Sequence, residues 1–515
     1  MSDTSANNKR IAKNTLMLYF RMLLMMLIGL YTSRVILDKL GEVDFGIYNV
    51  VGGFVTMFSL ISGAMTTATQ RFLSFEIGKG ENGDVKGIFS TMLMIHIFLA
   101  AVIVLAGETV GTWFLNNYMN FPPNRYEAAN WVFQFSLLVF VLNVVNVPYN
   151  GALIAYEKMS AFAYLSIIDA VLKLAICYVI VITPFDRLIV YAALMALVQI
   201  ALIAAYYLYC RKKFSACRFT GKFNRKYGKE VTSFVGWNLI GSLAGIAKEQ
   251  GVNVVLNMFF GPAVNAARGI AYQVLGKING FVSNFQMAMN PQIIKNYAAG
   301  DREDMYKLVF RGAKVSYILL LTLSLPVAIE APLVLGIWLK EVPDYTAIFL
   351  RLVILTALLN TLSNPLIISM HASGKVRDYQ IVVGGISLLT LPIVYVAFKL
   401  GAEPYYAMVI SFAVEFVCHI ARLYMLGRIM DFPMTKFLKS VTIRVYMVTI
   451  LSVVLPVLAY WEINLVVVRF FTVCILSVLS TLILGYYLGF NKHDREKIRE
   501  KVVGIIKKRF KRNNK

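Results

Sequence analysis

The chain has 515 residues, of which 58% are hydrophobic and only 15% are charged. Soluble domains carry about 25% charged residues, so this composition excludes a water-soluble globular protein and predicts an integral membrane protein. The formal net charge is +23, but no nucleic-acid-binding motif is present. Basic connections beside membrane spans explain the charge better, and we expect no nucleic-acid partner.

Apolar runs of about 20 residues follow one another along the chain, and this is the length that a helix needs to cross a bilayer. Backbone groups in lipid must hydrogen-bond within their own segment, so these runs predict about fourteen transmembrane helices and an all-α polytopic fold. The first run begins after Lys13 and is too long for the core of a signal peptide, so it should remain as a span. The runs centre near Leu24, Phe54, Phe98, Val139, Val171, Ala196, Gly245, Leu275, Leu320, Ala357, Leu388, Phe412, Ser452 and Cys474.

The connections between these runs alternate between a basic set and a nearly uncharged set. The positive-inside rule predicts that the basic set, and with it both termini, faces the cytoplasm. The basic set comprises the N-terminus with Lys9, Arg10 and Lys13, the segments 211–229, 295–311 and 422–439, and the tail after Lys492. The outer set comprises 122–125, 183–187, 261–264, 340–344 and 461–464.

A stretch from Val35 to Gly80 returns in altered form about 220 positions later. In this alignment Gly41 falls on Gly261 and Gly80 falls on Gly300. The repeat predicts two parallel six-helix lobes, because each half begins and ends on the cytoplasmic side. The predicted parts are an N-terminal lobe at 1–210, a basic cytoplasmic linker at 211–229, a C-terminal lobe at 230–428, two further helices at 429–490 and a basic cytoplasmic tail at 491–515, which could lie on membrane lipids.

Charged side chains inside a span cost roughly 2.5 to 3.5 kcal/mol each on insertion scales, so they are expected to pair or to face a cavity. Asp169 and Lys173 lie four residues apart in the fifth span, and they could be a structural pair or, with Glu249, a site that couples ion movement. Cations outnumber acids in the spans, which favours an anionic ligand such as a phosphate group. The candidate substrate-binding residues are Arg21, Lys248, Arg268 and Lys277, with Asn253, Asn257 and Gln273 as polar contacts for sugar.

Motifs for catalysis are missing from the sequence. It has no P-loop, no GxSxG elbow and no cluster of His and Cys residues with metal-ligand spacing. We therefore expect neither an enzyme nor a bound metal or cofactor. A membrane polymerase or ligase would also need charged outer loops, whereas the predicted outer connections are short and carry only scattered charges.

The first hairpin has the form L-G-x-x-x-F-G, at Leu40, Gly41, Phe45 and Gly46. Together with two six-helix halves, two further helices and a basic tail, it resembles the polysaccharide-transporter branch of the multidrug/oligosaccharidyl-lipid/polysaccharide (MOP) exporter superfamily. The most similar members are bacterial Wzx-type O-antigen flippases and the exporters of capsule or lipopolysaccharide. The resemblance implies a cavity between the lobes, lined mainly by spans one, two, seven and eight.

The resemblance also implies a function. Such a protein passes undecaprenyl-pyrophosphate-linked oligosaccharide from the inner to the outer leaflet of the bacterial cytoplasmic membrane by alternating access, and polysaccharide polymerase or ligase machinery would be its partner. In that case the four candidate cations would hold the pyrophosphate. A cation-coupled multidrug or metabolite antiporter of the same superfamily is the alternative, although such exporters usually have twelve spans and acidic cavity residues. A polymerase or ligase acting on lipid-linked sugars is a third, less favoured alternative.

Overall fold

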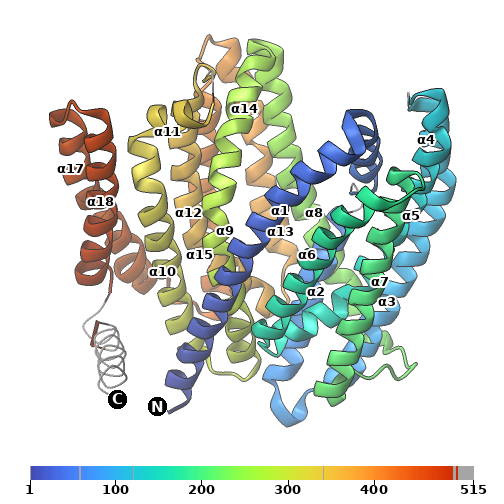
Figure 1. Cartoon of the computed structure of the whole chain (residues 1–515). Coiled ribbons are helices and arrows are strands. Elements are labelled where there is room, and N and C mark those ends of the chain that lie inside the picture. The colour runs from blue at the N-terminus through green and yellow to red at the C-terminus, as the bar shows by residue number, and fades with distance from the viewer. Residues whose placement is uncertain (1, 57–58, 120, 340–341, 491–494, 497–515) are drawn as a thin grey trace, which may run out of the picture. The chain divides into compact units, whose positions relative to one another are not determined.

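The computed structural model describes residues 2–56, 59–119, 121–339, 342–490 and 495–496. Every regular element in these ranges is a helix (Figure 1), so the predicted all-α class is confirmed. Ten helices among the described residues are long and apolar enough to cross a membrane. The chain is therefore a multi-pass membrane protein. The predicted tail lies outside the described residues except for 495–496, as do positions 340–341 of one predicted outer connection.

The first half of the chain contains seven of the described α-helices. α1 is one continuous element except at Gly41, whose φ of 81° and ψ of 168° break the helix between the first two predicted spans. The bounds are α1 (Ser2–Thr56), α2 (Ser59–Gly78), α3 (Val85–Ala106), α4 (Thr112–Tyr118), α5 (Tyr126–Ala155), α6 (Met159–Ile182) and α7 (Arg187–Lys213).

The second half begins with two long helices, α8 and α9, in which the sequence places the most polar spans. All fourteen predicted span centres fall within helices. Four of these centres lie in helices that are not among the ten apolar candidates: two in α1 and one each in α8 and α9. The bounds are α8 (Arg225–Phe260), α9 (Pro262–Ala298), α10 (Arg302–Ile329), α11 (Ala331–Trp338), α12 (Thr346–Ser373), α13 (Arg377–Leu388), α14 (Thr390–Lys399), α15 (Tyr406–Met430), α16 (Met434–Phe437), α17 (Ile443–Glu462) and α18 (Val466–Leu484).

The glycines that mark the sequence repeat share an unusual backbone conformation. Gly41 and Gly261 have φ values of 81° and 78°, and Gly80 and Gly300 have 62° and 79°. Positive φ is strained for residues with a Cβ, so glycine is the natural choice at each of these turns. The two halves therefore both have glycines with positive φ at matching positions.

Contacts divide the chain into two compact units. The first comprises 1–242 and 287–301, and the second comprises 243–286 and 302–515. Both divisions fall inside helices, so α8 and α9 each contribute to both units. The sequence places the division between the lobes in the loop 211–229, which here lies wholly within the first unit.

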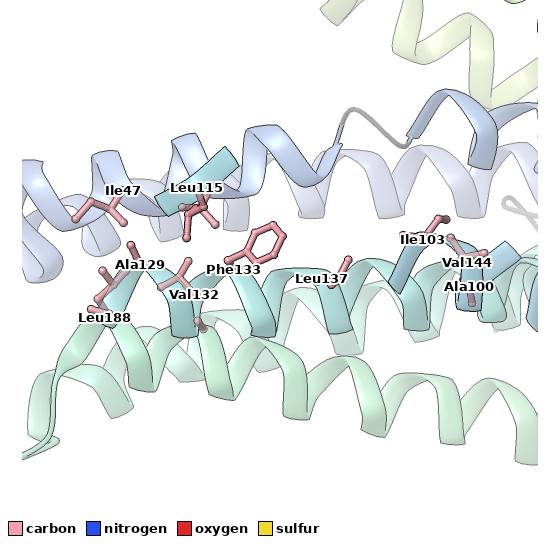
Figure 2. Packing of buried hydrophobic residues seen from close by; sticks show 13 residues of the cluster. Ile47, Ala100, Ile103, Leu115, Ala129, Val132, Phe133, Leu137, Val144 and Leu188 are labelled. Carbon is pink, nitrogen blue, oxygen red and sulfur yellow. The ribbon is translucent and has the colours of Figure 1, made fainter. Parts of the chain in front are cut away.

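The core of the first unit forms around α5. Figure 2 shows Val132 and Phe133 of α5 facing Ile47 of α1 and Leu115 of α4, with Leu137 further along the same helix. Phe133 is only 1% exposed. Burial of these side chains away from both lipid and water fixes the positions of α1, α5 and α7 relative to one another within this unit.

An ion cluster in the first unit joins two of the predicted outer connections, 122–125 and 183–187, to Asp44 of α1. The Arg125 Nε donates to Asp44 Oδ1 at 2.8 Å, and the same guanidinium is hydrogen-bonded to Asp186. Asp186 also caps α7 by accepting the backbone N–H of Leu188 at 3.0 Å and of Ile189 at 3.2 Å. Partial burial alone would raise the pKa of Asp186, but the hydrogen bonds from Arg125 and the helix N–H groups outweigh it and lower that pKa.

Within the second unit, α18 is bonded to a buried carboxylate by a partly exposed arginine. Arg469 of α18 donates from Nε to Glu330 Oε1 at 2.9 Å and from Nη2 to Oε2 at 3.1 Å. Glu330 lies between α10 and α11 and is fully buried. The ring of Tyr460 on α17 lies 4.5 Å from the Arg469 guanidinium carbon. Arg469 of α18 therefore contacts both Glu330 and the Tyr460 ring of α17.

Candidate functional site

Arg268 is the best-buried cation of α9. It is 5% exposed, and its guanidinium forms an ion pair with Glu249 of α8. It also donates to the Asn253 side-chain oxygen and lies 4.6 Å from the centre of the Tyr272 ring. The structure thus brings three predicted site residues together within the second unit and neutralises Arg268 inside the protein.

Lys248 links this pair to α15. Its Nζ lies 3.8 Å from Glu249 Oε1 and 3.9 Å from Glu415 Oε2. Glu415 in turn accepts a hydrogen bond of 2.6 Å from Nη1 of Arg422. Charges of alternating sign therefore run from Arg422 through Glu415, Lys248 and Glu249 to Arg268, and we call this set the α8–α9–α15 charge network.

The sequence did not predict the α15 end of this network. Glu415 pairs with Arg422, which lies seven residues, or two turns, further along α15. His419 instead shares a hydrogen bond of 2.8 Å with Ser363 of α12. Arg422 is the first residue of the predicted basic connection 422–439. Its spacing of seven from Glu415 is the sequence feature that could have indicated the pair.

The exposed face of α9 carries no large hydrophobic side chain among its described residues. From Ala263 to Gly276 the exposed positions recur every three or four residues, and Lys277 and Ser283 fall on the same side of the helix, so they form a single stripe. Most membrane helices here, α17 for example, expose several large hydrophobic residues instead. The exposed positions of α9, which we call the α9 stripe, are Ala263, Ala266, Gly269, Gln273, Gly276, Lys277 and Ser283.

Two of the predicted site residues, Gln273 and Lys277, lie four residues apart on the α9 stripe. Lys277 is exposed and makes no ion pair or hydrogen bond with any described residue. Asn257, near the end of α8, is exposed as well. These three side chains are available to a ligand without displacing an internal partner.

The other predicted residues lie in the first unit. Arg21 of α1 places its guanidinium carbon 4.7 Å from the centre of the Phe162 ring. On α6, Lys173 Nζ is 2.8 Å from Asp169 Oδ2, which fits the predicted spacing-four pair. Tyr206 of α7 interacts electrostatically with both Arg21 and Asp169. The predicted site residues are thus divided between two groups, one in each unit.

The first unit also contains a cavity of about 190 Å³ that the sequence did not predict. Its one strongly polar wall residue is Asn143, whose oxygen accepts a hydrogen bond of 2.9 Å from Gln199. The side-chain amides of Asn143 and Gln199, which lie inside apolar runs, are the sequence feature that could have indicated this cavity. The cavity is lined by Tyr48, Gly52, Phe135, Ser136, Val139, Phe140, Asn143, Ala192 and Met195.

Comparison with known proteins gives one family model and one curated relative. A family model described as MatE matches residues 18–179. The chain is 21% identical over 338 residues to EpsK of Bacillus subtilis, which is described as an uncharacterized membrane protein. That alignment covers 63% of this chain and 64% of EpsK, so the chain spans less than two thirds of this relative.

Solved structures match over a larger part of the chain. A multidrug resistance MATE family transporter of the MOP superfamily, in an outward-facing conformation, matches with a TM-score of 0.71 at 12% identity, covering 83% of this chain and 97% of its own. A MOP superfamily transporter from Pyrococcus furiosus, described by a binding pocket of reverse polarity that suggests a different function, matches with a TM-score of 0.68 at 13% identity over 84% of this chain and 96% of its own. The chain therefore has the two-lobed fold of the MATE transporters.

Proposed function

We propose that this protein is an alternating-access transporter of the polysaccharide branch of the MOP superfamily. It moves undecaprenyl-pyrophosphate-linked oligosaccharide from the inner to the outer leaflet of the bacterial cytoplasmic membrane, for O-antigen or capsule synthesis. The observation that carries the proposal is the α9 stripe, which offers a polar surface with an available cation inside a membrane helix.

A helix face of glycine, alanine and polar side chains is poorly suited to contact with lipid tails. Its small side chains offer little apolar surface, and the charged Lys277 would lose its hydration there. Such a face is better suited to line a water-filled passage. A sugar head cannot cross hydrocarbon alone, since its hydroxyl groups would lose their hydrogen bonds. Gln273 and Asn257 supply replacement partners, while the polyprenyl chain stays in the lipid.

Charge favours an anionic substrate. The part of α8 and α9 that belongs to the second unit, residues 243–286, contains three cations, Lys248, Arg268 and Lys277, against one carboxylate, Glu249. The surplus of two positive charges matches a pyrophosphate group, which Lys and Arg bind by charge-assisted hydrogen bonds. In this scheme Lys277 makes the first contact. Arg268 and Lys248 contribute by binding the incoming anion in addition to their carboxylate partners, Glu249 and Glu415.

The proposed direction follows from topology and membrane potential. The proposal takes both termini to be cytoplasmic, as the positive-inside rule predicts from the basic connections. An inside-negative potential then favours outward movement of an anion by about 2.3 kcal/mol per charge and 100 mV. Arg21 of the first unit adds a further cation to the path in this proposal, and the polysaccharide polymerase or ligase machinery receives the product.

A cation-coupled drug or metabolite antiporter is the alternative. The multidrug transporters among the structural neighbours favour it. So does Asp169, whose Oδ1 is buried and has no hydrogen-bond partner among the described residues. A cation could take that place beside Lys173. Such a protein would confer drug resistance that depends on the sodium or proton gradient, whereas a flippase would not.

The deciding experiment is deletion of the gene, followed by measurement of the leaflet in which lipid-linked oligosaccharide resides. We expect it to accumulate in the inner leaflet and surface polysaccharide to be lost. Complementation with Lys277→Ala should restore much less surface polysaccharide than complementation with Lys375→Ala, an exposed lysine after α12. Normal leaflet distribution in the deletion strain would rule out the proposed function.

A further inference from the structure

Two helices, α8 and α9, continue from one unit into the other, and each has a residue pattern that favours bending at that point. α8 crosses between Ser242 and Leu243, directly after a Gly241–Ser242 pair. α9 crosses between Gln286 and Met287. Pro291 lies four residues beyond Met287 and has no N–H, so the Met287 carbonyl has no helical hydrogen bond from it. Prolines and Gly/Ser pairs are the usual places where helices bend.

The part of α9 beyond its crossing is held by Glu157, in the turn between α5 and α6. The Glu157 side chain is fully buried. Lys295 donates from Nζ to its Oε1 at 2.5 Å, and Gln292 donates from Nε2 to its Oε2. The Glu157 backbone carbonyl accepts a hydrogen bond of 3.2 Å from the Asn14 side chain of α1. One residue thus connects the end of α9 with two further elements of the first unit.

Glu157 occupies a backbone conformation that favours glycine. Its φ is 58°, in the left-handed region at the end of α5, where the N–H of Lys158 bonds back to the carbonyl of Leu153 at 2.8 Å. The corresponding turn of the second half, after α12, has Gly374 with a φ of 74°. A strained residue persists only where its surroundings require it. Here the requirement is the carboxylate that holds α9.

Packing against α2 is equally tight. A Cβ added to Gly78, the last residue of α2, would lie 2.6 Å from the Lys295 carbonyl oxygen and 2.8 Å from the Ala298 Cβ. The rings of Phe75 and Tyr297 lie 6.4 Å apart beside this contact. The last turns of α9 are therefore fixed by close backbone approach as well as by the buried ion pair.

We propose that residues 287–298 form a hinged latch for the transport cycle. The latch stays with the first unit through Glu157, while the preceding part of α9 moves with the second unit. The helix bends at the start of the latch, where Pro291 leaves the Met287 carbonyl without its helical hydrogen bond. The Gly241–Ser242 pair gives α8 a matching hinge. This inference rests on the proposed function, because only a protein whose parts move against each other needs such a device. Glu157 is a positioning residue and touches no substrate.

The test uses the full-length protein in lipid nanodiscs and hydrogen–deuterium exchange. The double variant Glu157→Gly/Lys295→Met removes both charges and the backbone strain, so we expect a melting temperature near that of the unmodified protein. Exchange within 288–298 should nevertheless rise on the order of tenfold. The matched control, Glu330→Gln/Arg469→Met, removes another buried pair and should leave exchange in this segment unchanged. A folded double variant with unchanged exchange would overturn the latch.

Transport supplies the second readout. In a deletion strain, the double variant should restore surface polysaccharide on the order of tenfold less well than the unmodified gene. Pro291→Ala, which restores the helical hydrogen bond to Met287, should slow exchange around the hinge and also reduce export. Full export by both variants would refute the latch. If the unmodified protein exports no polysaccharide but the double variant still shows the faster exchange in 288–298, the proposed substrate is wrong and the proposed latch is supported.

Discussion

The α8–α9–α15 charge network gives a ranked set of stability predictions. Glu415 contacts two cations, Arg422 at 2.6 Å and Lys248 at 3.9 Å. Glu415→Gln removes the counter-charge of both. Arg422 is 8% exposed and would be left buried with only neutral partners. Removing one partner of a buried pair typically costs about 3–5 kcal/mol, so this variant should be the least stable.

The two cations should not be equivalent. Arg422→Met leaves Glu415 with Lys248, and a pair about 4 Å apart attracts by roughly 4 kcal/mol at an effective dielectric constant of 20, before desolvation is subtracted. The loss should therefore be about 1–3 kcal/mol. Lys248→Met leaves the shorter Arg422 contact intact and should cost less than about 1 kcal/mol. The double variant Glu415→Gln/Arg422→Met removes both buried charges and should recover most of the loss.

Thermal and denaturant unfolding of the purified protein in detergent, followed by tryptophan fluorescence or circular dichroism, would measure this ranking. Membrane yield of each variant provides an independent check of folding. A loss for Lys248→Met as large as that for Glu415→Gln would refute the reasoning, because it would mean that the longer contact dominates. The same conclusion would follow if the double variant were no more stable than Glu415→Gln.

Three further predictions concern the glycines and the outer ion cluster. Gly78→Ala should destabilise the protein by about 1–3 kcal/mol through overpacking against α9, whereas Gly276→Ala, with nothing within 4 Å of the added Cβ, should be neutral or slightly stabilising; thermal unfolding of the pair checks both. Gly261→Ala should cost about 1 kcal/mol or more because its φ is 78°, and equal melting temperatures would contradict this. Asp186 has a pKa below its ordinary value of 3.8, so its stabilising effect is present above that pH and is lost as the pH falls through the lower folded-state value. Below about pH 4 the melting temperature should therefore fall more steeply for the unmodified protein than for Asp186→Asn.

Local patterns in the sequence predicted the fold well. The requirement that backbone groups bond internally in lipid leaves helices as the outcome for long apolar runs. Glycines at matching positions of the repeat marked turns that need positive φ, and Gly41 and Gly261 both adopt it. The Asp169–Lys173 pair also follows from local spacing, since residues four apart share a helix face.

Arrangements that depend on tertiary packing could not be read in this way. The approach of Lys248 to Glu415 depends on how α8 lies against α15, and no spacing in the sequence encodes that. The division of the chain inside α8 and α9 was missed for a related reason. A basic loop reports on which side of a membrane it is expected to lie, but it carries no information about which helices share a core.

The ion pair between Glu330 and Arg469 has a consequence for the last two long helices, α17 and α18. A chain ending before α17 would leave the fully buried Glu330 carboxylate without its guanidinium partner. Stranding a charge in that environment is among the most damaging changes a folded protein can suffer. Removing α17 and α18 would therefore destabilise the junction of α10 and α11, where Glu330 lies. The two C-terminal helices are thus needed for the stability of the second unit.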